Sequence, residues 1–248
     1  YQVMNPQVTF HDYADDEVQY GYYFYFKEGL VFAWTNSELL DVDLQIFRKY
    51  TSVLSLTYRR YLDLQDTEAK AREAIKQSSL DRVRGKIASM RDAADLQQIT
   101  PLIWNELKAL EVPFFRCGIF ILNDAKKLIQ AYLTTPEGKA LGALNLDFDF
   151  SELTRNTVEF WRAGKVYQTH WSQAEFVDWT KEMMKEQQIE STTDYHGSLS
   201  PPESLYLHFI PFAQGMLYVG HGVQLPNEKI ELVESLADAF SFAYSRYQ

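Results

Sequence analysis

Residues with catalytic or metal-binding chemistry are few in this chain of 248 residues, and they form no catalytic signature. The sequence has no Gly-x-Ser-x-Gly elbow, no Gly-x4-Gly-Lys loop, no Gly-x-Gly-x-x-Gly fingerprint, no His-Glu-x-x-His helix and no Cys-x-x-Cys pair. None of the five histidines stands at metal-ligand spacing to another: His11, His170, His196, His208 and His221. We therefore expect no catalytic site and no metal site.

Cys117, the single cysteine, allows two interpretations. The neighbouring Arg116 can lower the pKa of the thiol and make it redox-active. Cys117 also belongs to an apolar alternation with Phe115, Ile119 and Ile121, which places its side chain on the apolar face of a strand. We favour the second interpretation, a buried and unreactive thiol.

His208 lies in another apolar stretch with strand-like alternation. Leu205, Leu207 and Phe209 alternate with it, so a strand places the His208 ring on the opposite face from these three side chains. A structural histidine with a satisfied hydrogen bond is expected there, in preference to a ligand contact.

The composition indicates a globular protein. Hydrophobic residues make up 46% of the chain and aromatic residues 15%, enough to bury one full core and part of another. The net charge of −10 argues against nucleic-acid binding, which needs a concentrated basic surface. On a helix, the one basic cluster is spread out, which favours a solvated or dimer-flanking face over a phosphate site. That cluster consists of Arg82, Arg84, Lys86 and Arg91.

Cellular location is predicted from what the sequence lacks. No run of 18 apolar residues and no signal peptide is visible, so we expect no membrane partner. A single cysteine suits a reducing compartment, and we expect a cytoplasmic protein. The first residue is not Met, which indicates a fragment of a longer protein.

Two segments of the chain repeat one another without a gap. Residues 17–61 align with residues 203–247, since 203 − 17 and 247 − 61 are both 186. The shared pattern is an aromatic hairpin about a glycine, Gly29 or Gly215, followed by a helix. A period this long indicates a repeated domain. We therefore expect the chain to close one domain, cross a linker and build a second of the same kind.

One long helix is predicted from Asp41 to about Met90, because this stretch has no Pro and a single Gly. Its hydrophobic residues occupy heptad positions in two phases, separated by a break near residues 77–79. The first phase has Leu54, Tyr61 and Ile75 at one position and Thr57, Leu64 and Ala71 at another. The second phase consists of Leu80, Val83, Ile87 and Met90.

These heptads predict a parallel coiled coil that joins two copies of the chain into a homodimer, with the second phase as the seam of the dimer helix. The alternative is a single amphipathic helix that lies on its own domain.

The second half of the chain alternates between helical and strand patterns. The expected order is helix, three strands, helix, strand, helix, two strands and helix, with a capping box of Ser172 and Glu175 at one helix start. This order predicts an α+β fold, in which helices flank an antiparallel sheet. A long coiled-coil helix and a partial copy of the same domain precede it.

Residues 95–248 resemble a GAF-type sensor domain of the GAF/PAS group, and the linker before them resembles the signalling helix of bacterial multidomain signalling proteins. The resemblance rests on the segment Leu80-Asp-Arg-Val-Arg-Gly-Lys-Ile-Ala-Ser-Met90 and on a closing Tyr-x-Arg-Tyr motif. That motif is present as Tyr58-Arg-Arg60-Tyr61 and as Tyr244-Ser-Arg246-Tyr247. The resemblance implies three parts: the C-terminal part of a first GAF-like domain (1–45), a signalling helix or coiled coil (46–94) and a second GAF-like domain (95–248).

The resemblance also implies a position for a ligand. In GAF-like domains ligands lie between the sheet and the segments that correspond to residues 141–169 and 191–202. The motifs for cyclic nucleotides and for bilin attachment are not reproduced, so the expected ligand is an unidentified small molecule. The aromatic and polar residues implied for this pocket are Asn145, Arg155, Trp161, His170, Trp171, Tyr195 and His196.

The function implied by the resemblance is that of a non-catalytic sensory and dimerisation module in a cytoplasmic signal-transduction protein. A conformational change would pass through the long helix to an output domain outside this chain, such as the histidine kinase of a two-component system. The alternative is a purely structural repeat that forms homodimers without a ligand. The expected partners are a second copy and a small molecule, with no nucleic acid and no membrane.

Overall fold

The structure is a computed structural model of the chain, and it describes residues 18–90, 95–192, 195 and 200–245. The chain divides into two compact units, residues 1–71 and residues 72–248. Helix α1, Asp41–Ala88, contributes residues to both, and its length agrees with the long helix predicted from the sequence.

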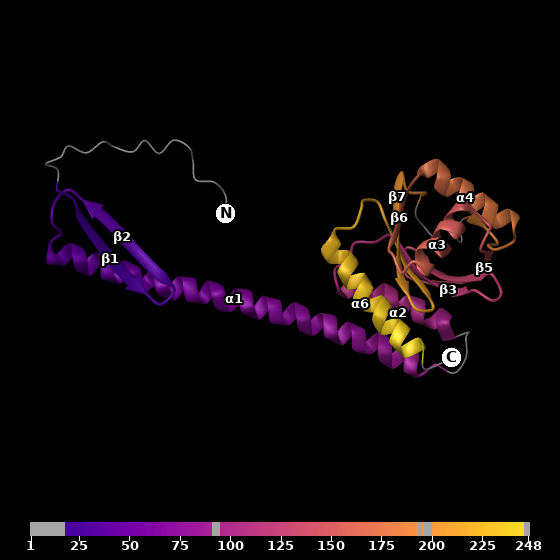
Figure 1. Cartoon of the computed structure of the whole chain (residues 1–248), viewed down its shortest axis with the longest axis horizontal. Helices are drawn as coiled ribbons and strands as arrows, with labels where there is room; N and C mark the ends of the chain where they lie inside the picture. Colours follow the sequence, from indigo (N-terminus) through magenta and orange to yellow (C-terminus); the bar gives the residue numbers. More distant parts are fainter. Residues whose placement is uncertain (1–17, 91–94, 193–194, 196–199, 246–248) are drawn as a thin grey trace. The chain divides into compact units, whose positions relative to one another are not determined.

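The first unit contains a hairpin that packs on a helix (Figure 1). Strands β1, Tyr20–Phe26, and β2, Gly29–Thr35, pair antiparallel and lie along the N-terminal part of α1. The inward hairpin face is half-buried, and the rings of Phe24 and Phe47 stack there with their centroids 5.1 Å apart. The hairpin is therefore held by its own helix on one face.

The outward face of this hairpin is aromatic and exposed. Tyr25 is 76% exposed, Phe32 61% and Trp34 58%. Neither strand has a second partner strand in the part of the chain that the structure describes. Because a two-stranded sheet alone is marginal in water, the hairpin depends on α1 for its stability.

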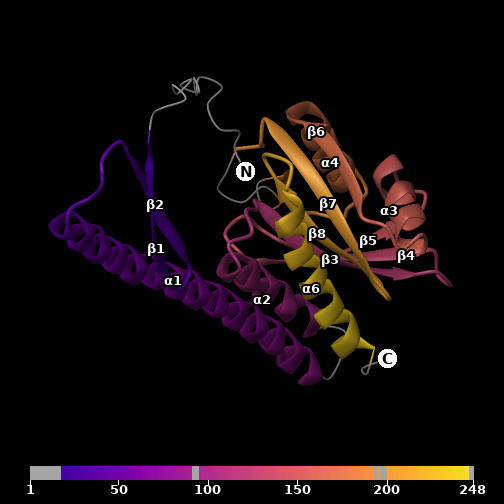
Figure 2. The same cartoon turned by 60° about the vertical axis from the view of Figure 1, so that its left-hand side comes forward.

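The second unit is built on a six-stranded antiparallel sheet with the strand order β5-β4-β3-β8-β7-β6 (Figure 2). The central strands β3 and β8 are buried along almost their whole length. Aliphatic and aromatic residues dominate both, as expected for strands covered on two sides. The strands are β3, Arg116–Asn123; β4, Leu128–Thr134; β5, Ala140–Asp147; β6, Tyr167–Ser172; β7, Ser204–Phe212; and β8, Gly215–His221.

Helices cover both faces of this sheet (Figure 2). One face carries α2, Leu96–Ala109, and α6, Asn227–Tyr244, together with the last turns of α1. The other face carries α3, Glu152–Arg162, and α4, Gln173–Lys185. A hydrophobic core lies on each side of the sheet. The predicted α+β fold, an antiparallel sheet flanked by helices, is confirmed.

The predicted capping box starts helix α4. Glu175 Oε2 accepts a hydrogen bond from the Ser172 backbone N–H at 2.7 Å, and Ser172 Oγ accepts one from the Glu175 N–H at 3.4 Å. Ser151 and Thr154 form a second capping box at the start of α3. Both boxes satisfy N–H groups that a helix start leaves unpaired, which fixes where α3 and α4 begin.

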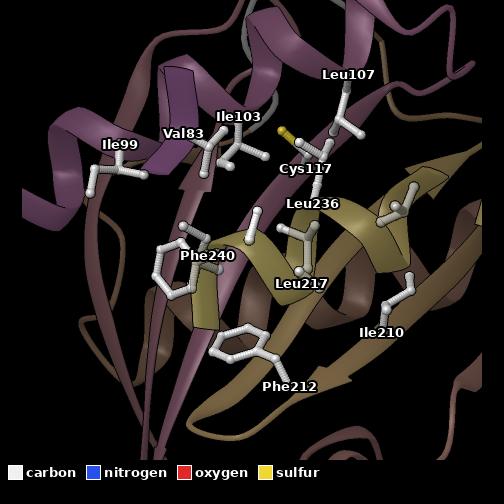
Figure 3. Close-up of a cluster of buried hydrophobic side chains, with 14 of the residues drawn as sticks. Val83, Ile99, Ile103, Leu107, Cys117, Ile210, Phe212, Leu217, Leu236 and Phe240 are labelled. Atoms are coloured by element: carbon white, nitrogen blue, oxygen red, sulfur yellow. The ribbon is translucent and has the colours of Figure 1, made fainter. Parts of the chain in front are cut away.

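The last turns of α1 pack inside their own chain, which corrects the predicted dimer seam. Leu80, Val83 and Ile87 are buried in the core formed with α2 and α6, and Met90 packs against it. Figure 3 shows Val83 beside Ile103 of α2 and above the side chains of α6. Side chains without exposed surface cannot form the seam of a coiled coil. The alternative, an amphipathic helix on its own domain, describes this segment.

An ion pair between a buried carboxylate and a half-exposed arginine also joins α1 to α2. The Glu106 residue is 3% exposed, and its carboxylate accepts hydrogen bonds from Arg82 Nε at 2.7 Å and Nη2 at 2.6 Å. Two parallel charge-assisted bonds of this kind are strong and fix the relative orientation of their partners. Arg82 therefore binds Glu106 of its own domain while its side chain stays 48% exposed, which agrees with the solvated face that the sequence favoured.

The hairpin–helix segments of the internal repeat match in register and in their hydrogen bonds. Strands β1 and β2 pair in the same register as β7 and β8, shifted by 186 positions, and α1 and α6 begin 186 positions apart. The Leu39 N–H donates to Tyr22 Oη at 2.8 Å, and the Leu225 N–H donates to His208 Nε2 at 3.2 Å. The same bond ties the loop after the hairpin in both copies.

A second bond is repeated between the helix and the hairpin turn. Ser55 Oγ donates to Glu28 Oε2 at 3.3 Å, and Ser241 Oγ donates to Gln214 Oε1 at 3.0 Å. The two copies therefore share tertiary contacts as well as sequence. His208 is the structural histidine expected from the alternation, since its ring accepts the loop bond described above.

We predict that Val83→Asp lowers the free energy of unfolding of the second unit by more than about 3 kcal/mol, because it places a carboxylate in a core without a partner. Urea unfolding followed by tryptophan fluorescence measures this. Ser89→Asp, at an exposed position near the end of the same helix segment, is the matched control and should change stability by less than about 0.5 kcal/mol. If Val83→Asp were as stable as the wild type but had half its molecular mass in solution, Val83 would belong to an interchain seam and the prediction would be wrong.

We predict that amide hydrogens of β1 and β2 exchange faster than those of β7 and β8, because among the described residues the second hairpin alone is flanked by further strands and covered on both faces. Hydrogen exchange with mass spectrometry compares the two hairpins in one sample. Equal protection in a protein shown to be monomeric would contradict the prediction.

We predict that stability declines as the pH falls below about 6.5, because burial lowers the pKa of His208 in the folded state and the unfolded chain then binds the proton more readily. His208→Gln keeps a hydrogen-bond acceptor and should make this decline shallower. The control is His170→Gln, at an exposed position, which should keep the wild-type profile. Unfolding midpoints in denaturant from pH 5 to pH 8 provide the measurement. Identical profiles for wild type and His208→Gln would count against the prediction.

Candidate functional site

A small aromatic cavity lies in the second unit, on the α3 and α4 side of the sheet. Its volume is about 20 Å³, enough for one water molecule. The lining is largely apolar and comes from all six strands, from α3 and α4, and from Tyr195 after α4. Aromatic lining residues are Phe120, Trp171, Phe176, Trp179, Tyr195, Phe209 and Tyr218.

Arg116 is a buried cation beside this cavity. It lies on β3 and is 2% exposed. Its guanidinium carbon is 4.1 Å from the centre of the Tyr195 ring and 5.8 Å from the centre of the Phe176 ring, both of which line the cavity. An arginine carries its charge at any physiological pH, so a full positive charge is held in an aromatic environment.

The hydrogen bonds of Arg116 are incomplete. Nη2 donates to the backbone carbonyl of Tyr195. Nε and Nη1 are buried and have no hydrogen-bond partner, and no carboxylate pairs with this guanidinium among the residues that the structure describes. Burying a charge without a counter-charge disfavours the folded state by several kcal/mol. Arg116 therefore stands out as a buried cation that contacts two rings of the cavity lining and has two nitrogens without a hydrogen-bond partner.

Aromatic contacts hold Tyr195 over Arg116. The Trp179 Nε1–H donates to Tyr195 Oη at 3.3 Å, and the Phe176 and Tyr195 ring centroids are 6.2 Å apart. Both Phe176 and Trp179 lie on α4, whose start is fixed by its capping box. The pKa of the Tyr218 phenol, in the same cavity lining, is raised because burial disfavours its anion.

The residues implied by the family resemblance are only partly brought together. Trp171 and Tyr195 line the cavity. Asn145 is exposed on β5, where its backbone N–H donates to Gln188 Oε1 at 2.7 Å. His170 is exposed on β6 and hydrogen-bonds Ser204 Oγ at 2.8 Å.

Two further residues of that set lie away from the cavity, and one is outside the described residues. Arg155 of α3 is exposed and donates from Nη1 to the Asp149 carbonyl at 3.3 Å. Trp161 Nε1–H donates to the Phe212 carbonyl at 3.0 Å. His196 is the residue outside the described part of the chain.

Cys117 is buried and points away from this cavity, into the core with α2 and α6 (Figure 3). Burial raises the pKa of the thiol to about 12, an effect larger than the opposing effects of the Thr134 hydrogen bond and the Arg116 charge. The unreactive thiol favoured from the sequence is therefore the form present at neutral pH.

Arg116 was missed as a site residue, although the sequence contains a signal for it. The apolar alternation that places Cys117 in one core places Arg116 in the other, because consecutive side chains on a strand face opposite sides. An arginine in line with Phe120 and Leu122 of the same strand is a charge on a buried face. What the sequence does not contain is the position of Tyr195, 79 residues further along the chain.

Membrane-spanning helices and clustered metal ligands are both absent from the described residues. The helices there include none with the length and apolar character that a membrane crossing requires. The described side chains also include no group of three or more His, Cys, Asp or Glu residues placed to hold a metal ion.

No protein-family model matches the chain, and no curated protein matches it. Solved structures similar to it include three GAF domains. The GAF domain of a Coxiella burnetii phosphoenolpyruvate-protein phosphotransferase is 14% identical, with 69% of this chain and 95% of that chain covered and a TM-score of 0.41. The GAF domain of the Acinetobacter phosphoenolpyruvate-protein phosphotransferase is 12% identical, with 68% and 92% covered and a TM-score of 0.39. Another GAF domain structure is 13% identical, with 69% and 88% covered and a TM-score of 0.38.

Proposed function

We propose that this chain is a sensory and dimerisation module of a signal-transduction protein, without catalytic activity of its own. A small molecule binds in the second unit, and helix α1 carries the resulting change toward other parts of the protein. The observation that carries this proposal is the position of Val83 and Ile87, because these residues of the long helix belong to the core of the domain that holds the cavity.

Strand β3 connects the cavity to that helical layer. Arg116 and Phe120 lie on its cavity side, whereas Cys117 and Ile119 lie in the core with α1, α2 and α6. A rearrangement at the cavity that shifts β3 changes the surface against which the last turns of α1 pack. Packed cores switch between discrete arrangements more readily than they deform continuously, which suits a two-state signal.

The first unit supports a tandem arrangement, in which residues 1–45 belong to a first domain of the same kind as residues 95–248. The exposed Tyr23 and Phe32 correspond by the 186-residue shift to Phe209 and Tyr218, which are 1% and 5% exposed beneath α3 and α4. We propose that an equivalent layer of a first domain covers the hairpin face. Residues 46–94 then act as the signalling helix between the two domains.

We propose that dimerisation uses the first heptad phase of α1 in place of the second. Leu54 is 42% exposed, Tyr61 52% and Leu64 55%, so an apolar stripe of this helix lacks cover within the first unit. This stripe also fits the rival function, a structural repeat that forms homodimers without a ligand. A ligand that binds the folded protein separates the two functions, because it raises the melting temperature by mass action.

We predict that the wild-type chain is a dimer in solution and that the double variant Leu54→Asp, Tyr61→Asp is monomeric, since carboxylates at a helix seam oppose association. Ser52→Asp, exposed on the opposite side of the heptad, is the control and should leave the dimer intact. Size-exclusion chromatography with light scattering measures the mass. A monomeric wild type, or a double variant that remains a dimer, would contradict the proposal that the chain dimerises through this stripe.

A further inference from the structure

We infer that Arg116 anchors a small ligand with a single carboxylate in the aromatic cavity of the second unit. This inference rests on the proposed sensory function and names the chemical class of its ligand. It starts from the two buried nitrogens of Arg116 that have no hydrogen-bond partner among the described residues.

Arg116 lacks the ion-pair partner that Glu106, another buried charged side chain of this domain, has among the described residues. The buried Glu106 carboxylate has a bidentate arginine partner, Arg82. Arg116 is buried to a similar degree and has a backbone carbonyl and two aromatic rings, but no acid, around it in the described part of the chain. A carbonyl and ring faces stabilise a cation less than a carboxylate does. In our inference a bound anion supplies the partner that the described residues do not provide.

Packing alone does not account for an arginine at this position. Replacing an incompletely paired buried charge by an apolar residue of similar volume is commonly neutral or stabilising. On the same face of β3, Gly118 comes next, and Phe120 and Leu122 beyond it are both buried in this core. An apolar side chain could therefore fill position 116 in this core. The charged side chain at this position supports a role in ligand binding.

The cavity limits the ligand to one negative charge and a short apolar body. Its lining is aromatic and aliphatic, and Arg116 is the one cation that contacts these rings among the described residues. A second negative charge would stay uncompensated in this low-dielectric site. A carboxylate can accept two parallel hydrogen bonds from a guanidinium, and an apolar tail can pack against Phe120 and Leu133.

Tyr195 occupies the place that the carboxylate would take. Its carbonyl holds Nη2, its ring covers the guanidinium, and the remaining volume admits one water molecule. Binding therefore replaces the Tyr195 carbonyl on Arg116 and shifts the ring of Tyr195. This displacement is the local change that the ligand would produce. Arg116 is the first residue of β3, and other residues of β3 belong to the core in which the last turns of α1 pack.

The test is a thermal-shift titration of the complete chain at constant ionic strength. The probes are straight and branched aliphatic carboxylates of two to six carbons, and the matched neutral probes are the corresponding amides. We expect some of the carboxylates to raise the melting temperature saturably, and their amides to have no effect.

In Arg116→Met the half-saturating concentration should rise by about tenfold or more, and the ligand-free melting temperature should stay equal or increase. Arg155→Met, at an exposed arginine of the same unit, should respond as the wild type does.

Three results would overturn the inference. The first is that carboxylates and amides stabilise the wild type equally, the second is that Arg116→Met keeps the full carboxylate shift, and the third is that no carboxylate of the series binds. A neutral compound that stabilises both wild type and Arg116→Met would leave the sensory function standing and remove its carboxylate anchor. If Arg116→Met does not fold, Arg116→Lys replaces it: the charge stays but the planar fork is lost, and weakened carboxylate binding with an unchanged fold supports the inference.

Discussion

Burial of strand β3 on both faces is the constraint on which the second unit depends. Cys117, Ile119 and Ile121 belong to the core beneath α2 and α6, whereas Phe120 and Leu122 belong to the core beneath α3 and α4. A strand between two cores needs helices on both sides, and the layered α+β arrangement follows. Close packing leaves little freedom in sequence: a Cβ on Gly118 would lie 2.5 Å from the Tyr132 carbonyl oxygen, closer than atoms can approach.

The end of α1 shows why a heptad pattern is ambiguous. Leu80, Val83 and Ile87 recur at spacings that fit a coiled coil, and the same spacings fit a helix that packs on its own domain. The sequence predicts which face is apolar, but the identity of the partner depends on tertiary contacts with α2 and α6, which the spacing within one helix does not encode. The partner of Arg82, Glu106, was undetectable for the same reason.

Local patterns predicted the fold well and the site poorly. Strand alternation, the capping box at Ser172 and the 186-residue repeat depend on neighbours in the sequence, and the structure contains all three. The site depends on which strands become adjacent. Arg116 and Tyr195 meet because β3 and the segment after α4 converge on one sheet face, and no local pattern encodes that encounter. The family resemblance grouped exposed positions such as His170 and Asn145 with Tyr195, because it implies which segments surround a ligand and not which side chains point toward it.

The burial of Val83 and Ile87 affects how this protein can be divided. A boundary at residue 95, where the sequence predicts the start of the second domain, removes the turns of α1 that fill one core, together with the Arg82 partner of the buried Glu106. The excised piece would expose an apolar groove between α2 and α6 and leave a carboxylate buried alone. The second compact unit therefore begins within the helix, and a truncation that keeps this core intact retains residues from about Arg72 onward.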